Sequence, residues 1–323
     1  MDIIIWFGIL LISLAVLVKA SDYFTDYSEK FGVSIGLSAF IIGATIVSMG
    51  TSMPELATAF LASFNGNEAL KSFAIDNVLG SNIANALLVI GISALAVKGG
   101  LKIKKILIDI DLPFFFIASA FLVLFIGDGV FTWKEGILSL VLSIIFILYT
   151  LSQQGRVEET NTSKKAKKTS TTFKNSRTFF ILMIALSGGF IFLGGKGTVD
   201  SVMKLSELLG WSSSALTLLI VALGTSLPEI VVSVIASLKG NHAIAIGNAF
   251  GSNIFNSLIV TGIPSLFMDL EVSDLAFSVG IPFFIVASFA CIFATMDNKV
   301  AFWEGCAMLV LYAAFVGNVT GIM

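Results

Sequence analysis

The chain has few charged residues, and this shortage excludes a water-soluble fold. Only 12% of its 323 residues are Asp, Glu, Lys or Arg, whereas 56% are hydrophobic and the mean hydropathy is +0.98. Soluble domains usually carry about 25% charged residues. The chain therefore cannot cover one aqueous core with a charged surface, and we expect its surroundings to be membrane lipid.

Cysteine and histidine are almost absent, which narrows the chemistry that the chain can perform. Cys291 and Cys306 lie in apolar stretches without metal-ligand spacing, so we interpret them as small buried hydrophobic residues. The single histidine, His242, stands near Lys239 and is interpreted as a surface residue at a loop. A membrane-embedded protease would need a catalytic dyad or an HExxH cluster, so we do not expect an enzyme. We also expect no cofactor and no nucleic-acid partner.

Long apolar segments fill most of the sequence. A membrane-spanning helix needs about 20 predominantly apolar residues. Ten segments meet this requirement, near 3–20, 35–64, 72–97, 106–126, 131–151, 178–196, 212–238, 243–268, 275–295 and 301–321. A polar segment rich in Ser, Thr and Lys separates five of them from the other five. We therefore expect five-helix repeats at 1–151 and 178–323, joined by a linker at 152–177.

The positions of the basic residues predict an orientation, because Lys and Arg accumulate in cytoplasmic loops. Most of the 19 basic residues lie in the linker, or in loops on its side of the membrane. The apolar start has no basic region before it, so it is interpreted as a retained first span. We expect a multi-pass protein of the cell inner (plasma) membrane with a cytoplasmic linker and extracellular termini.

Two sequence blocks occur twice, in the same order. Residues 43–63 align without gaps with 217–237, and residues 75–92 align with 246–263. Such a duplication indicates that each half is one five-helix unit. Because five is odd, equivalent points of the halves face opposite sides of the membrane, as in secondary transporters. The expected fold is an all-α membrane protein of ten transmembrane helices in two inverted five-helix repeats, with broken helices at the repeated motifs.

The first block contains Gly-Thr-Ser-x-Pro-Glu, at 50–55 and again at 224–229. Gly and Pro interrupt a helix, because Pro lacks an amide donor. In lipid, the carbonyl groups that lose a donor need another partner. We expect this of the carbonyl groups around Ser48, Met49 and Thr51, and around Ala222, Leu223 and Thr225. Together with hydroxyl and carboxylate oxygens, they would suit a hard cation.

The glutamates of the first block, Glu55 and Glu229, decide how it is interpreted. A single copy of the motif could equally be a proline kink capped by Ser and Thr. A carboxylate near the centre of a bilayer costs about 2.5–3.5 kcal/mol on insertion scales. Two carboxylates at equivalent positions would also repel each other without a cation between them. The pair therefore favours a cation site.

The second block reads Gly-Ser-Asn-Ile-x-Asn, at 80–85 and again at 251–256. Ser81 and Asn85 are four residues apart and share a helix face, as do Ser252 and Asn256. Neutral oxygens beside two carboxylates suit sodium and can complete a calcium shell. The alternative is hydrogen bonding between helices, with glycine for close packing. Asp76 stands near the end of a predicted span, where the second repeat has Gly247; it is interpreted as solvated, with a role at the ion entrance as the alternative.

The paired blocks resemble the alpha-repeats of the sodium/calcium exchanger family, within the cation/calcium exchanger superfamily, and most closely its compact prokaryotic members. The resemblance covers nearly the whole chain and implies that four helices form a diamond of cation sites at mid-membrane. It implies that Glu55 and Glu229 bridge calcium, helped by backbone oxygens of Thr51 and Thr225. Sodium would bind the side chains of Thr51, Ser52, Ser81, Thr225, Ser226 and Ser252, and the carbonyl groups of Ser48 and Ala222.

The resemblance also implies secondary active antiport of sodium and calcium by alternating access. Asn256 stands where many prokaryotic relatives and the potassium-dependent branch carry Asp, which argues for potassium-independent exchange. Calcium/proton antiport is the alternative, although the GNxxE pattern of that branch does not occur in this sequence. A channel could use the same oxygens, but inverted repeats with acidic midplane sites favour alternating access. A ten-helix bundle can work as a monomer, and calcium, sodium and lipid are the expected partners.

Overall fold

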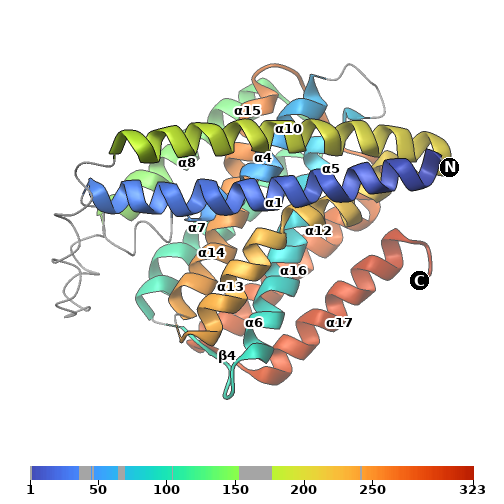
Figure 1. Ribbon diagram of the computed structural model, residues 1–323. Helices are drawn as coiled ribbons and strands as arrows, with labels where there is room; N and C mark the ends of the chain where they lie inside the picture. The colour runs from blue at the N-terminus through green and yellow to red at the C-terminus, as the bar shows by residue number, and fades with distance from the viewer. Residues whose placement is uncertain are drawn as a thin grey trace.

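The computed structural model describes residues 2–35, 45, 47–64, 70–103, 105–152, 177–240 and 242–323. Within these ranges the protein is almost entirely helical (Figure 1). Eight of the described helical stretches are long and apolar enough to cross a membrane, namely Asp2–Gly32, Phe73–Ala96, Trp133–Ser152, Arg177–Leu209, Ser213–Leu238, Ile244–Ser265, Ala276–Met296 and Phe302–Val319. Large apolar side chains such as Leu124 and Trp303 are exposed, as expected for a protein surrounded by lipid.

These eight stretches correspond to eight of the ten predicted spans, and the other two spans are described in part. The span predicted near 106–126 forms α7 (Lys105–Phe125). The span predicted near 35–64 contains α3 (Ser48–Thr51) and α4 (Met53–Ser63), and part of its beginning lies outside the described residues. Most of the predicted linker at 152–177 also lies outside them.

Two helices of 33 residues, α1 (Asp2–Ser34) and α10 (Arg177–Leu209), pack side by side across the other helices (Figure 1). The Arg177 guanidinium donates to the Ser34 carbonyl oxygen at 2.6 Å, so the end of α1 meets the start of α10. The two helices are therefore antiparallel. Each is about 50 Å long. The hydrocarbon core is only about 30 Å thick, so both helices must tilt or extend beyond it.

The spans predicted near 3–20 and 178–196 are too short, because polar residues continue both helices. In α1 the Lys19 ammonium lies 3.6 Å from the Asp22 carboxylate, and in α10 Lys204 lies 2.8 Å from Glu207. Pairs at this spacing face each other on a helix and support it. The hydrophobic run in the sequence therefore indicates only the part of each helix that lies in lipid.

Short strands mark the two ends of the helix bundle. They form two antiparallel pairs, β1 (Leu101–Lys102) with β4 (Lys299–Val300) and β2 (Val130–Phe131) with β3 (Leu270–Glu271). Helix α7 runs from β1 to β2, whereas α16 (Ile281–Met296) runs from β3 to β4. These two helices therefore run in opposite directions between the same two ends, which we call the β1–β4 end and the β2–β3 end.

Two segments at the centre are almost completely buried. The first comprises α5 (Phe73–Ile83), the π-helical turn η3 (Ala84–Val89) and α6 (Ile90–Ala96). The second comprises α14 (His242–Phe255), the π-helical turn η7 (Asn256–Val260) and α15 (Gly262–Ser265). The remaining elements are α8 (Trp133–Ser152), α11 (Ser213–Leu216), η6 (Thr217–Val221), α12 (Ala222–Thr225), α13 (Leu227–Leu238), η8 (Ala276–Gly280) and α17 (Phe302–Val319). Turns of π-helix often occur at functional sites.

Glycines bring α17 and α8 close to the central segments. A Cβ atom built at Gly305 of α17 would lie 2.9 Å from the carbonyl oxygen of Gly91 in α6. In the other half, a Cβ atom at Gly136 of α8 would lie 3.1 Å from the carbonyl oxygen of Gly262 in α15. Small residues allow helix backbones to approach in a membrane, where close packing replaces the hydrophobic effect.

The substitution Gly305→Val should therefore lower the melting temperature of the purified protein. Valine would push α17 away from α6, and overpacking of this kind costs about 1–3 kcal/mol. Gly189→Val on α10 is the matched control, because a Cβ atom there meets nothing within 4 Å. Thermal unfolding of both variants in detergent checks this, and equal melting temperatures would contradict the proposed glycine contact.

Candidate functional site

Each copy of the first block forms a helix that breaks and resumes. Helix α3 ends before Ser52 and α4 begins after it, and α12 and α13 are separated in the same way by Ser226. The two serines have nearly the same backbone angles, φ −87° and ψ 8° at Ser52 and φ −81° and ψ 3° at Ser226. Pro54 and Pro228 stand in the first turn of the resumed helices. The repeated sequence therefore gives the same break twice.

The break changes the partners of the carbonyl groups before it. Pro54 has no amide hydrogen for the carbonyl of Gly50, which accepts a nearby backbone N–H and the Ser21 hydroxyl of α1, at 2.5 Å. The carbonyl oxygens of Ser48 and Ala222 still accept backbone bonds from the break serines, at 3.1 Å each. For the carbonyl groups of Met49, Thr51, Leu223 and Thr225, the expected turn toward an ion stays a prediction.

The two glutamates are completely buried and are held by hydroxyl groups from both halves. Glu55 Oε1 accepts hydrogen bonds from Ser81 at 3.3 Å and from Ser226 at 3.4 Å. Glu229 Oε1 accepts them from Ser252 at 3.2 Å and from Ser52 at 3.0 Å. Each glutamate is thus bonded by the serine of its own second block and by the break serine of the other half.

Threonine hydroxyls and the carbonyl groups before the breaks complete the ring of oxygens. Ser252 Oγ lies 3.5 Å from the Ser48 carbonyl oxygen and 3.3 Å from Thr51 Oγ1. In the other half, Ser81 Oγ lies 3.4 Å from the Ala222 carbonyl oxygen and 3.5 Å from Thr225 Oγ1. These residues come from segments far apart in sequence, yet the structure brings them to one place beside the glutamates.

Several buried polar atoms at this place have no hydrogen-bond partner within the described part of the chain. They are Glu55 Oε2, Glu229 Oε2, and the amide oxygen and nitrogen of both Asn85 and Asn256. Asn85 lies on η3, which packs against α13, and Asn256 lies on η7, which packs against α4. Nearly all buried polar groups in proteins are paired, so this cluster needs an explanation. Carboxylate, amide and hydroxyl oxygens are the ligands of hard cations such as sodium and calcium.

Two asparagines that the sequence analysis did not single out position the glutamates. The Asn77 amide donates to the Glu55 carbonyl oxygen at 3.5 Å and to Thr58 Oγ1 at 3.3 Å. The Asn248 amide donates to the Glu229 carbonyl oxygen at 3.4 Å and to Ser233 at 3.1 Å. Both asparagines are identical residues of the aligned second blocks, and this identity was the signal that could have found them.

The sequence matches the family described as sodium/calcium exchanger protein over residues 5–152 and 179–321. The matched ranges contain both glutamates and all four blocks. The chain belongs to this family. The resemblance drawn from the paired motifs is therefore confirmed, and this member of the sodium/calcium exchanger family is a multi-pass membrane protein.

Individual relatives match over almost the full length. The chain is 31% identical to the sodium/calcium exchanger MaX1 of Methanosarcina acetivorans, over 96% of the chain and 97% of that protein. It is 30% identical to the membrane protein MJ0091 of Methanocaldococcus jannaschii, over 98% of both. The structure is similar to that of the sodium-calcium exchanger NCX_Mj soaked with 10 mM Na⁺ and zero Ca²⁺, with a TM-score of 0.68 and 28% identity over 98% of this chain and 99% of that one.

The interpretation of Asp76 as a solvated residue is wrong. Its side chain is completely buried at the β2–β3 end, where it accepts hydrogen bonds from Ser72 at 2.9 Å and from Ser273 at 2.7 Å. The prediction failed because these hydroxyls replace water, and one of them comes from the other half of the chain. His242 is half-buried and is the first residue of α14.

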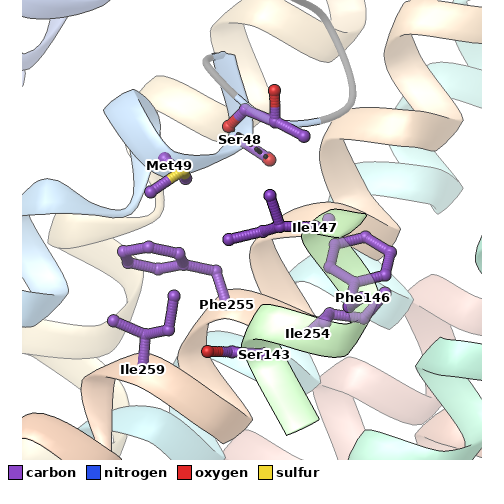
Figure 2. A pocket seen from close by; sticks show the side chains of 10 residues that line it. Ser48, Met49, Ser143, Phe146, Ile147, Ile254, Phe255 and Ile259 are labelled. Atoms are coloured by element: carbon purple, nitrogen blue, oxygen red, sulfur yellow. Dashed lines mark hydrogen bonds between the residues drawn. The ribbon is translucent and has the colours of Figure 1, made fainter. Parts of the chain in front are cut away.

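A small cavity lies beside the broken helix of the first half. Figure 2 shows Ser48 and Met49 on one side of it, and Phe146 and Ile147 of α8 on another. Its lining is mostly apolar, with hydroxyl groups only from Thr45, Ser48 and Ser143. Neither glutamate is among the lining residues. The cavity therefore borders the candidate site without forming part of it.

We predict that calcium stabilises this protein and that Glu55→Gln or Glu229→Gln removes most of the effect. A ligand present at about 100 times its Kd stabilises the folded state by about 2.7 kcal/mol. Glutamine keeps the acceptor for the serines but supplies no charge to a cation. Thermal unfolding with and without calcium checks this, with Glu207→Gln on the exposed part of α10 as the control. An unchanged calcium shift in both site variants would contradict the assignment.

Proposed function

We propose that this protein is a secondary active antiporter that exchanges sodium for calcium across the cell membrane by alternating access. The observation that supports this most strongly is the reciprocal arrangement of Glu55 and Glu229. Each is bonded by the break serine of the other half, and each keeps one oxygen without a partner. MaX1 and NCX_Mj, which are named as sodium/calcium exchangers, match nearly the whole chain.

The donor set explains why a cation must occupy the site. Two buried carboxylates cost free energy unless opposite charge compensates them, and each senses the charge of the other. Calcium takes six to eight oxygen ligands. Glu55 and Glu229 would bridge it, with Thr51 and Thr225 contributing backbone oxygens. Sodium would use the side-chain oxygens of Thr51, Ser52, Ser81, Thr225, Ser226 and Ser252, the carbonyl groups of Ser48 and Ala222, and the neutral amides of Asn85 and Asn256.

The exchange is obligatory because sodium and calcium use the same ligand oxygens. Serine hydroxyls that coordinate sodium are the same groups that bond the glutamate oxygens, so calcium and sodium compete for one set of atoms. An empty site would leave two uncompensated carboxylates in the bilayer, and this opposes movement of the protein without an ion. The moving parts would be α1 and α10, which pack on each other and contact the broken helices.

We also propose the finer topology, ten spans in two inverted repeats. Contacts between distant loops support it, since each joins points separated by an even number of predicted spans. These contacts are β1 with β4, β2 with β3, Arg177 with Ser34, Ser72 with Ser214, and Lys71 with Glu271. Inversion is supported by α7 and α16, which run in opposite directions and are joined at equivalent positions by Ser119 and Ser288, 3.5 Å apart.

The function is tested by calcium uptake into vesicles that contain the purified protein and are loaded with sodium. Dilution into sodium-free buffer should drive radioactive calcium in, and Glu55→Gln or Glu229→Gln should abolish uptake because a bridging charge is lost. Glu207→Gln should transport like the wild type. Uptake that follows a pH gradient and ignores sodium would instead identify a calcium/proton antiporter. A requirement for potassium on the side that releases calcium would identify potassium-dependent exchange.

The topology and orientation predict which face of the membrane each strand pair occupies. Variants without Cys291 and Cys306 would carry one new cysteine, as Lys299→Cys in β4 or as Asp128→Cys before β2. We expect a membrane-impermeant thiol reagent added to intact cells to label Asp128→Cys, and to label Lys299→Cys only after the cells are opened. The predicted cytoplasmic linker requires this order. Labelling of both positions from the same side would contradict the ten-span arrangement.

A further inference from the structure

Two buried aspartates outside the central site occupy related positions on different helices. Asp76 on α5 stands where α14 has Gly247, because residues 75–77 align with 246–248. Asp111 on α7 stands where the second half has Gly280, because Pro-Phe-Phe at 113–115 recurs at 282–284. Helix α5 packs against η8 and α16, and α14 packs against α7. Each of these packed pairs therefore combines one aspartate with one glycine. In the first pair the aspartate is on α5 and the glycine is Gly280, whereas in the second pair the aspartate is on α7 and the glycine is on α14.

Asp111 has a buried carboxylate with nothing to bond. The residue is 1% exposed, and neither carboxylate oxygen has a hydrogen-bond partner among the residues that the structure describes. A Cβ atom built at Gly247 would lie 3.9 Å from Asp111 Oδ2 and would meet no other atom within 4 Å. The glycine therefore leaves space directly beside the carboxylate. A buried carboxylate without partners is costly unless a cation or a proton neutralises it.

Asp76, the other aspartate, is a carboxylate at the related position that does have hydrogen-bond partners. Asp76 accepts hydrogen bonds from Ser72 and Ser273, and Ser214 lies 3.3 Å from Ser72. The described elements that pack most extensively on α7 are α14, α16, η7 and α8. Their titratable side chains are His242, Cys291, Lys134, Glu135 and Tyr149. None of these forms a bond with Asp111, so the described residues leave its charge uncompensated.

Asp111 lies between the β1–β4 end and the central site. It is six residues from the start of α7, about 9 Å along the helix from its first residue. Its neighbour Gly247 directly precedes Asn248, whose amide group bonds the Glu229 carbonyl oxygen and whose oxygen accepts from Thr51. A cation held at Asp111 would therefore be adjacent to the residue that positions the second glutamate.

We propose that Asp111 and the space beside Gly247 form a separate binding site for one monovalent cation, sodium or a proton. A single carboxylate balances one positive charge, whereas a divalent cation would leave an excess charge in the interior. No cluster of three or more His, Cys, Asp or Glu occurs among the residues that the structure describes, which also disfavours a divalent ion here. The proposal does not use Glu55 or Glu229, so it stands apart from the proposed exchange.

The test counts the sodium ions that the purified full-length protein binds at equilibrium, using radioactive sodium. If sodium occupies the site, Asp111→Asn binds one ion fewer than the wild type, and Asp297→Asn, an exposed aspartate at the same end, binds as many as the wild type. The double variant Asp111→Gly with Gly247→Asp returns the carboxylate to the same space from the other helix, and it should regain the lost ion. Glu229→Gln changes the central site but leaves the ion at Asp111 in place, so it distinguishes the two sites in the sodium count.

The pH dependence of calcium uptake into vesicles distinguishes a proton from sodium. If a proton occupies the site, the wild type and Asp111→Asn bind the same number of sodium ions. The pH dependence of calcium uptake that the wild type shows is then absent in Asp111→Asn. An Asp111→Asn variant with both the sodium count and the pH profile of the wild type would overturn the proposal. If this variant does not fold, Gly247→Ala fills part of the space at ordinary contact distance. It should weaken cation binding at the site about tenfold, equivalent to about 1.4 kcal/mol, and unchanged binding would also overturn the proposal.

Discussion

The central constraint on the structure is that two carboxylates are buried together and repel each other unless positive charge compensates them. Glu55 and Glu229 have no contact with solvent, and each is oriented by a serine that interrupts a helix of the other half. The break is needed because an intact helix would use its own carbonyl and amide groups, and its serines would not reach across. Asn77 and Asn248 then fix the backbone that carries each acid. The resulting cage supplies oxygens around a negative centre, and the proposed transport follows from that centre having to be neutralised.

Much of this arrangement could be predicted from the sequence, because it rests on local patterns that occur twice. Hydropathy marked the apolar helices, and Gly-Thr-Ser-x-Pro-Glu marked both breaks, which the structure places at Ser52 and Ser226. The paired motifs also indicated the family. The lengths of α1 and α10 were underestimated, because hydropathy does not register polar turns that are stabilised by pairs along the helix.

What the sequence could not provide was the pairing between residues far apart in the chain. Asp76 was interpreted as solvated because its partner Ser273 lies in the other half. Asp111 was not considered, because it stands outside the two repeated blocks in an apolar segment. Its isolation becomes apparent only when α7 is seen beside Gly247. Similarly, Ser21 could not be assigned as the partner of the Gly50 carbonyl group before α1 was placed against the broken helix.

The bond between Ser21 and Gly50 also makes the two halves unequal. At the related position α10 carries Val199, and the neighbouring hydroxyls of Thr198 and Ser201 are bonded to carbonyl groups of their own helix. A typical hydrogen bond contributes about 0.5–1.5 kcal/mol net. If α1 and α10 slide symmetrically over the other helices, the bond between Ser21 and Gly50 would form at one end of the movement. No corresponding bond would form at the other end. If the proposed inverted repeats give two mirror-related resting positions, Ser21 would favour one of them over the other.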